Sequence, residues 1–203
     1  MKNKNTCLLV AVVSGMVTLQ SAPAATLTSA GMGGDSSFLV LETPLLGVLE
    51  FEVFYDFDPS VPIGTTDLLR IIADSNSLFM VDFSEFGSAE QPNEFLNSVT
   101  FDGVTEAQPA DFSAFFGFFG AGGQTGTIQD ASGAFVPAPE SISFNSFTST
   151  AGLSAPFRIV EPGSTDAIVF GPFGTEPSFD PIPEPSTVLL LSAFSLLSLR
   201  RRR

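Results

Sequence analysis

The sequence predicts an α+β protein, mostly β, built as a single antiparallel-sheet domain with one short helix at about residues 65–75. Residues 48–57 alternate apolar and acidic side chains, which is the pattern of a strand with one wet face. Leu68, Ile71 and Ile72 then share one face at helical spacing. Short apolar runs divided by Gly, Pro and Asn fill the rest of the domain, so an all-β sandwich is the alternative.

The remaining expected strands are short apolar runs between turn residues. They lie at residues 36–41, 78–83, 95–101, 112–119, 142–147, 157–160 and 167–170. Asp102-Gly103 follows one of these runs directly and predicts a tight hairpin turn.

Residues 112–119, here called the Phe-rich segment, have the most unusual local composition. Read as a strand, the segment places Phe116 and Phe118 on one face and Phe115 and Phe119 on the other. Burial of both faces is the favoured interpretation. An exposed aromatic surface for a partner or for glycan stacking is the alternative.

The N-terminus has the three parts of a secretory signal peptide, at residues 1–24. Two lysines precede an apolar run at residues 7–19, and Ala22-Pro23-Ala24 fits the small-residue cleavage pattern. Cleavage after Ala24 is favoured over cleavage after Ala25, and an uncleaved anchor is the alternative. An extracytoplasmic β-rich domain is then expected at residues 25–172.

The C-terminus, residues 183–203, also has three parts in a fixed order. These are the motif Pro183, Glu184, Pro185, Ser186 and Thr187, an uncharged apolar run at residues 187–199, and a basic tail of Arg200, Arg201, Arg202 and Arg203. The apolar run is roughly 20 Å of helix, shorter than the usual membrane span, so a buried helix is the alternative. A core helix needs a polar face, which this run lacks, so a short transmembrane helix is favoured. Residues 173–182, rich in Pro and Gly, are expected to be an exposed linker.

This tail resembles the PEP-CTERM sorting signal, also known as the ice-binding-protein C-terminal motif. Residues 183–187, the apolar run and the terminal arginines match it, with Val188 where the family usually has Trp. The resemblance implies a protein exported by a Gram-negative bacterium and held transiently in the inner membrane. It further implies processing by an exosortase and a final location at the cell surface or outside the cell. It implies no biochemical activity for the domain itself.

A second resemblance concerns the order of elements in the domain. Two strands, a helix that begins Gly64-Thr-Thr-Asp-Leu-Leu69 and several later strands are similar to β-grasp-type domains that resemble the C-terminal domain of transcobalamin-like proteins. Residues 95–103 and 162–168 also match. The Phe-rich segment stands where those families place Trp or Tyr. The resemblance therefore implies a β-grasp-like sheet with one helix, and we expect no cofactor.

The composition excludes most catalytic and metal-binding chemistry. The sequence has no histidine, and its single cysteine, Cys7, lies in the signal peptide. We therefore expect no enzyme, no catalytic residue, no cofactor and no metal site. Asp56, Asp58 and Asp67 have the spacing of a calcium loop, but a strand that ends in an Asp/Pro turn is the favoured interpretation. A glycosidase pair among the many carboxylates stays open.

The expected mature protein is strongly acidic. Six of the eight basic residues and one of the 22 acids lie in the two terminal signals, so residues 25–183 carry two basic and 21 acidic residues, a net charge of −19. Such a surface repels nucleic acid, which we exclude as a partner. We expect an exported, transiently anchored cell-surface or extracellular-matrix protein, with an exosortase, the inner membrane and extracellular polysaccharide as partners. The alternative is an extracytoplasmic module that binds a glycan, a small molecule or calcium.

Overall fold

A computed structural model describes residues 27–88 and 91–182. They contain one helix, α1 (Thr65–Ser75), and twelve strands: β1 (Leu27–Gly31), β2 (Asp35–Thr43), β3 (Gly47–Tyr55), β4 (Phe79–Ser88), β5 (Gln91–Phe101), β6 (Val104–Ala107), β7 (Phe115–Ala121), β8 (Gln124–Gln129), β9 (Phe135–Ser141), β10 (Thr148–Ser149), β11 (Arg158–Ile159) and β12 (Thr165–Gly171). The expected signal peptide and sorting signal lie outside the described residues. Within residues 27–88 and 91–182, no helix has the length and apolar character that a membrane span requires.

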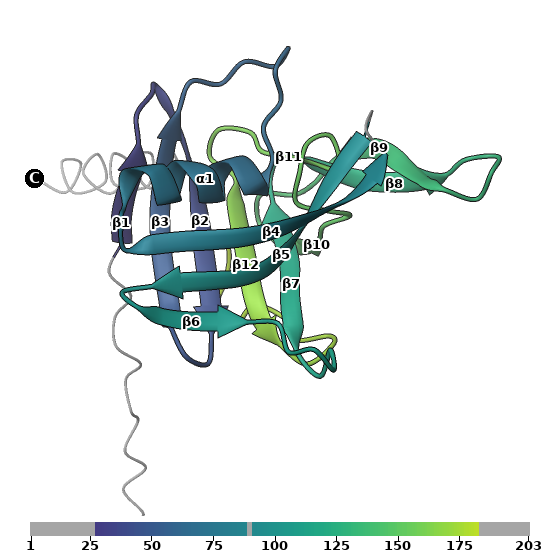
Figure 1. Ribbon diagram of the computed structural model, residues 1–203. Helices are drawn as coiled ribbons and strands as arrows, with labels where there is room; N and C mark the ends of the chain where they lie inside the picture. The colour runs from purple at the N-terminus through teal and green to yellow at the C-terminus, as the bar shows by residue number, and fades with distance from the viewer. Residues whose placement is uncertain (1–26, 89–90, 183–203) are drawn as a thin grey trace, which may run out of the picture.

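The strands form three sheets, shown in Figure 1. The largest has the order β1-β3-β2-β12-β7-β10, and the two smaller ones have the orders β4-β5-β6 and β11-β8-β9. Helix α1 and the β4-β5-β6 sheet lie over one face of the six-stranded sheet, while the β8–β9 hairpin extends away to the side. The prediction of a mostly β fold with one short helix is confirmed.

The prediction of one antiparallel sheet is wrong. The main sheet is mixed, because β1 pairs with β3 and β12 pairs with β2 in parallel. Apolar alternation defines the two faces of a strand but says nothing about the direction of its neighbour. Strands β2 and β3 are antiparallel because a short turn joins them, whereas β12 follows a long connection and can enter beside β2 in the same direction.

The main core lies between the six-stranded sheet and the layer made by α1, β4 and β5. Helix α1 contributes Leu68, Leu69 and Ile72, none of which is exposed. Phe51 of β3 meets Phe79 of β4 edge to face, with the ring centroids 5.3 Å apart. These contacts explain why the helical and alternating patterns were visible in the sequence: each element has one face in this core.

Two local predictions have clear outcomes. The Asp102-Gly103 turn is confirmed, because it joins β5 to β6 with φ of 48° and 78°, values that the tight hairpin turn requires. The strand expected at residues 142–147 is wrong, since β9 ends at Ser141 and a turn follows. Strand β9 instead contains Pro137 and Pro139, which is tolerated because β9 is the edge of its sheet.

Candidate functional site

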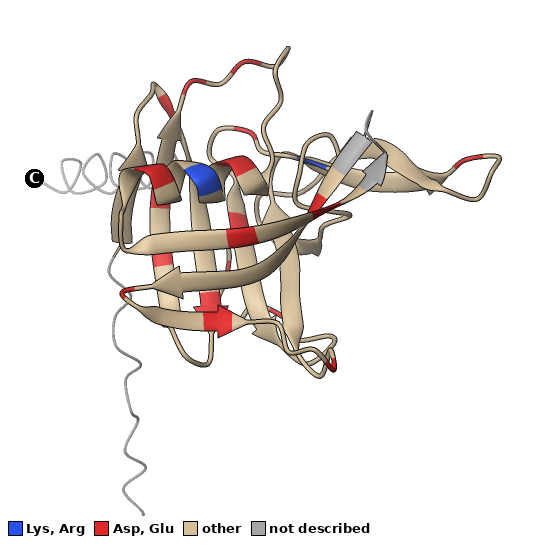
Figure 2. Ribbon diagram, viewed as in Figure 1, with Lys and Arg blue, Asp and Glu red and all other residues tan. Residues whose placement is uncertain are grey.

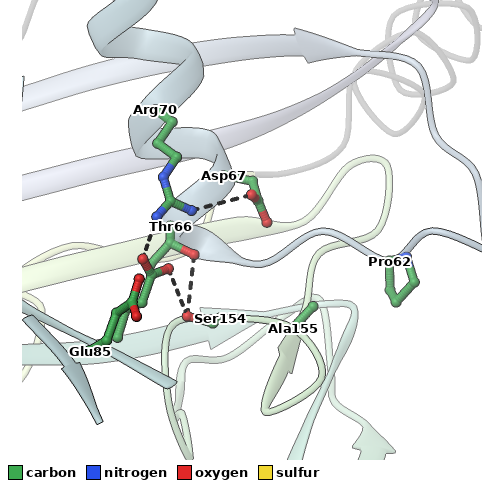
Figure 3. Close-up of a pocket in the computed structure, with 8 residues that line it drawn as sticks. Pro62, Thr66, Asp67, Arg70, Glu85, Ser154 and Ala155 are labelled. Carbon is green, nitrogen blue, oxygen red and sulfur yellow. Dashed lines mark hydrogen bonds and ion pairs between the residues drawn. The ribbon is translucent and has the colours of Figure 1, made fainter. Parts of the chain in front are cut away.

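A polar cavity of about 320 Å³, the polar pocket, lies beside the first turn of α1 (Figure 3). It is lined by Pro62, Thr66, Asp67, Arg70, Glu85, Glu94, Ser154 and Ala155. Three parts of the chain meet here: the start of the helix, the paired strands β4 and β5, and the loop before β11. The first turn of α1, the pairing of β4 with β5 and the loop before β11 place these side chains around the cavity.

Arg70 is held from three sides. Its Nη1 lies 3.6 Å from Oδ1 of Asp67, one helical turn earlier, and its Nη2 forms an ion pair with Oε1 of Glu94. The guanidinium carbon also lies 5.4 Å from the ring centroid of Phe83, within cation–π range. About half of the Arg70 side chain is exposed, so it presents a positioned cation at the pocket wall.

Glu94 is the most buried charged group of the polar pocket. Its Oε1 accepts from Arg70, and its Oε2 accepts from the Ser154 hydroxyl at 3.0 Å. The Thr66 hydroxyl donates in turn to Ser154 Oγ at 3.5 Å. Both carboxylate oxygens of Glu94 therefore have partners, and the carboxylate fixes Arg70 and Ser154 in place.

The polar pocket has an excess of negative charge. Glu85 stands directly opposite Glu94 on the neighbouring strand, an arrangement that is unfavourable for like charges. Asp67 adds a third carboxylate against the single guanidinium of Arg70. The pocket therefore favours neutral hydroxyl-bearing or cationic groups over anions.

The sequence-based calcium-loop candidates do not form one site. Asp58 Oδ1 accepts from the backbone N–H and the hydroxyl of Ser60, and these bonds lower the pKa of Asp58. Asp67 accepts from the Gly64 N–H at 2.8 Å, where it fixes the start of the helix. Asp56 accepts from the Gly34 N–H at 3.1 Å. Within residues 27–88 and 91–182, no group of three or more His, Cys, Asp or Glu side chains is placed to hold a metal ion.

The Phe-rich segment contributes to both the core and the surface. Phe116 is buried and packs 4.7 Å from Phe170, centroid to centroid. Phe115 and Phe119, on the other face of β7, are half-buried and line an apolar pocket of about 240 Å³. Phe112, before the strand begins, is 69% exposed. Phe118, on the same face as Phe116, is half-buried and also lines this apolar pocket. The expected burial of both faces is therefore only partly met: Phe116 is buried, and Phe115, Phe118 and Phe119 are half-buried.

The sequence did not predict the buried ion pair of Arg158 and Asp166, which lies beside Thr65, the first residue of α1. Arg158 and Asp166 are almost fully buried and paired, and the Thr65 hydroxyl also donates to Asp166. Arg158 Nη1 donates to the carbonyl oxygens of Gly122, at 2.8 Å, and Ile159, at 2.9 Å. No local sequence pattern marks an arginine as buried, and this cluster joins strands rather than lining a cavity.

Most charges on the domain are acidic, as Figure 2 shows. Arg70 and Arg158 are the only basic residues in the described part of the chain, and both are ion-paired. The predicted sorting residues, Pro183 to Thr187 and Arg200 to Arg203, lie outside it. Comparisons with protein-family models, with curated proteins and with solved structures find no match for this chain.

Proposed function

We propose that this chain is an exported, non-enzymatic protein of the cell surface or extracellular matrix. It is anchored transiently in the inner membrane by residues 187–199 and processed by an exosortase at residues 183–187. The observation that carries the proposal is the opposed pair of terminal signals. A signal peptide at one end directs the domain outward, and the four terminal arginines at the other keep the tail inside.

The acidic domain is consistent with this role. With its two basic residues engaged in ion pairs, the described surface has no free cationic patch with which to hold nucleic acid or anionic lipid. Extracellular polysaccharide is the expected environment. The lack of histidine in the whole sequence supports a binding or structural role over catalysis, because histidine is the commonest general base.

Mass spectrometry of the protein from envelope and medium tests this proposal. We expect an N-terminus at Ala25 and loss of the arginine tail from the released form. Deletion of residues 183–203 should abolish retention of the protein in the envelope. Phe135→Ala is the control: Phe135 is an exposed side chain outside the tail, and its replacement should leave retention unchanged. An intact N-terminus at Met1, or a cytoplasmic location, would overturn the proposal.

We also propose that the domain is related to the β-grasp fold. Strands β2 and β3 form a hairpin, α1 follows it, and β12 enters parallel to β2 between β2 and β7. The name β-grasp denotes such a hairpin and helix with a late central strand parallel to the first. Strands β4 to β6 are an addition to this order: in the chain they lie between α1 and β7, and they form a separate sheet over the same face as α1.

A ligand-binding role is the second candidate, favoured by the polar pocket. Its size suits a small polar molecule or one sugar unit, and Thr66, Ser154 and Arg70 offer positioned hydrogen-bonding groups. A thermal shift of the purified protein with calcium and with polysaccharide from the same strain tests this role. Arg70→Met should remove a polysaccharide-induced shift that arises in the polar pocket, and no shift under any condition would rule the role out.

A further inference from the structure

Residues 172–182, which we call the C-terminal strap, lie against the domain instead of extending from it. The Ser178 backbone N–H donates to Glu42 Oε2 at 3.0 Å. The Ile182 carbonyl accepts from Thr165 Oγ1 at 3.3 Å. The strap is therefore hydrogen-bonded to β2 and, at its last described residue, to the first residue of β12.

An aromatic contact joins the strap to the domain between these bonds. The half-buried Phe179 ring meets Phe147 edge to face at a centroid distance of 5.5 Å. Phe173 lies 5.6 Å from Phe115, centroid to centroid, but is 91% exposed and contributes little to docking. From Gly174 to Asp180 the side chains alternate between exposed and half-buried. This is the pattern of an extended segment with one face on a surface.

The strap helps to cover the second face of the six-stranded sheet. Val40, Ala167 and Val169 are at most 3% exposed, although they are not part of the main core cluster. Val169 lines the apolar pocket together with Phe173 and Thr175 of the strap. Docking of the strap thus buries apolar surface and has a favourable free energy of its own.

The docked strap leaves little chain between the domain and the expected membrane segment. Residues 183–186 span at most about 14 Å when fully extended. With the strap released from Pro172 onward, fifteen residues, 172–186, precede the apolar run and span up to about 54 Å. An enzyme that acts at residues 183–187 therefore works close to the folded domain in the docked state and farther from it in the released state.

We propose that docking of the strap limits processing, so that the enzyme acts on the released state of residues 172–182. This inference rests on the proposed sorting function. The observed processing rate is then the intrinsic rate multiplied by the released fraction, so weaker docking accelerates processing. The folded domain controls when its own sorting motif becomes accessible.

Two measurements on the full chain test the inference. Amide hydrogen exchange of the purified protein reports release of residues 172–182, and pulse–chase labelling in an exosortase-bearing strain reports conversion of the precursor. Phe179→Ala removes the edge-to-face contact and should raise both rates about two- to tenfold. Glu42→Ala should act in the same direction, whereas Glu42→Gln, which keeps an acceptor oxygen, should act less.

Phe135→Ala is the matched control, because Phe135 is 68% exposed and lies in β9. It should change neither rate. Equal acceleration of exchange and processing in Phe179→Ala supports the inference. Faster exchange with unchanged processing, or no change in either rate, overturns it while leaving the sorting proposal intact. A wild-type precursor that is never processed overturns the sorting proposal, and this inference with it.

Discussion

Replacement of Arg158 by Met should destabilise the domain more than any exposed charge substitution. The Asp166 carboxylate is only 1% exposed, and the change removes its cationic partner. The hydrogen bond from the Thr65 hydroxyl remains. The change also removes the donor to the carbonyls of Gly122 and Ile159. Breaking a buried pair in this way costs about 3–5 kcal/mol, a large part of the roughly 5–15 kcal/mol that stabilises a domain.

Urea unfolding followed by circular dichroism measures this cost. With a slope of about 2 kcal/mol per molar urea, the midpoint should fall by roughly 2 M. Arg158→Met combined with Asp166→Leu should recover much of the loss, because no unpaired charge then remains buried. Arg70→Met, at an ion pair whose arginine is about half exposed, should cost less, about 1 kcal/mol. The reasoning would be refuted if the loss of unfolding free energy in the double variant equalled the sum of the two single losses. A loss below about 1 kcal/mol for Arg158→Met would refute it too.

Three further predictions concern single positions. Burial raises the pKa of Tyr55, the only tyrosine, to about 12, so its near-ultraviolet titration midpoint should lie near that pH. The unfolded phenol ionises at a lower pH, so stability should fall by about 3 kcal/mol as pH rises from 10 to 12, and a midpoint near 10 would contradict this. Gly64→Ala places a Cβ 2.4 Å from the Leu153 carbonyl oxygen and should cost about 1–3 kcal/mol in thermal unfolding, whereas Gly34→Ala, with open space around it, should be near neutral. Ser60→Ala should return the lowered pKa of Asp58 toward its ordinary value, as carboxyl NMR titration can show.

The sequence revealed those elements that have one buried and one exposed face. Strand β3 and helix α1 were predicted closely, because burial of one face leaves a period that can be read locally. Strands β1 and β8 were missed, since their residues are small or polar and become strands through pairing with neighbours. Strand β12 was found only in part, because all seven of its residues are buried and no alternation marks its ends.

The polar pocket shows the same limit. Asp67 and Arg70 are one helical turn apart, and their proximity follows from the predicted helix. Glu94 and Ser154 come from distant parts of the chain. They lie close together because of the pairing of β4 with β5 and the path of the loop before β11. Nothing in the local sequence specifies that register, so composition alone suggested many carboxylates and no particular site.

The acidity of the domain and the docking of the strap act together in the proposed sorting process. A net charge of −19 on residues 25–183 is repelled by anionic headgroups, but salt screens this repulsion beyond about 8 Å. With the strap docked, the domain stays within about 14 Å of the apolar run, where part of the repulsion persists. Release of the strap allows the domain to move several screening lengths away and removes the repulsion. Electrostatics therefore favours the released state at the membrane surface, while burial of Val169 and the Phe179 contact favour the docked state in solution. On this reasoning, a membrane with fewer anionic lipids should slow processing of the wild-type chain more than that of Phe179→Ala, whose strap is already loosened.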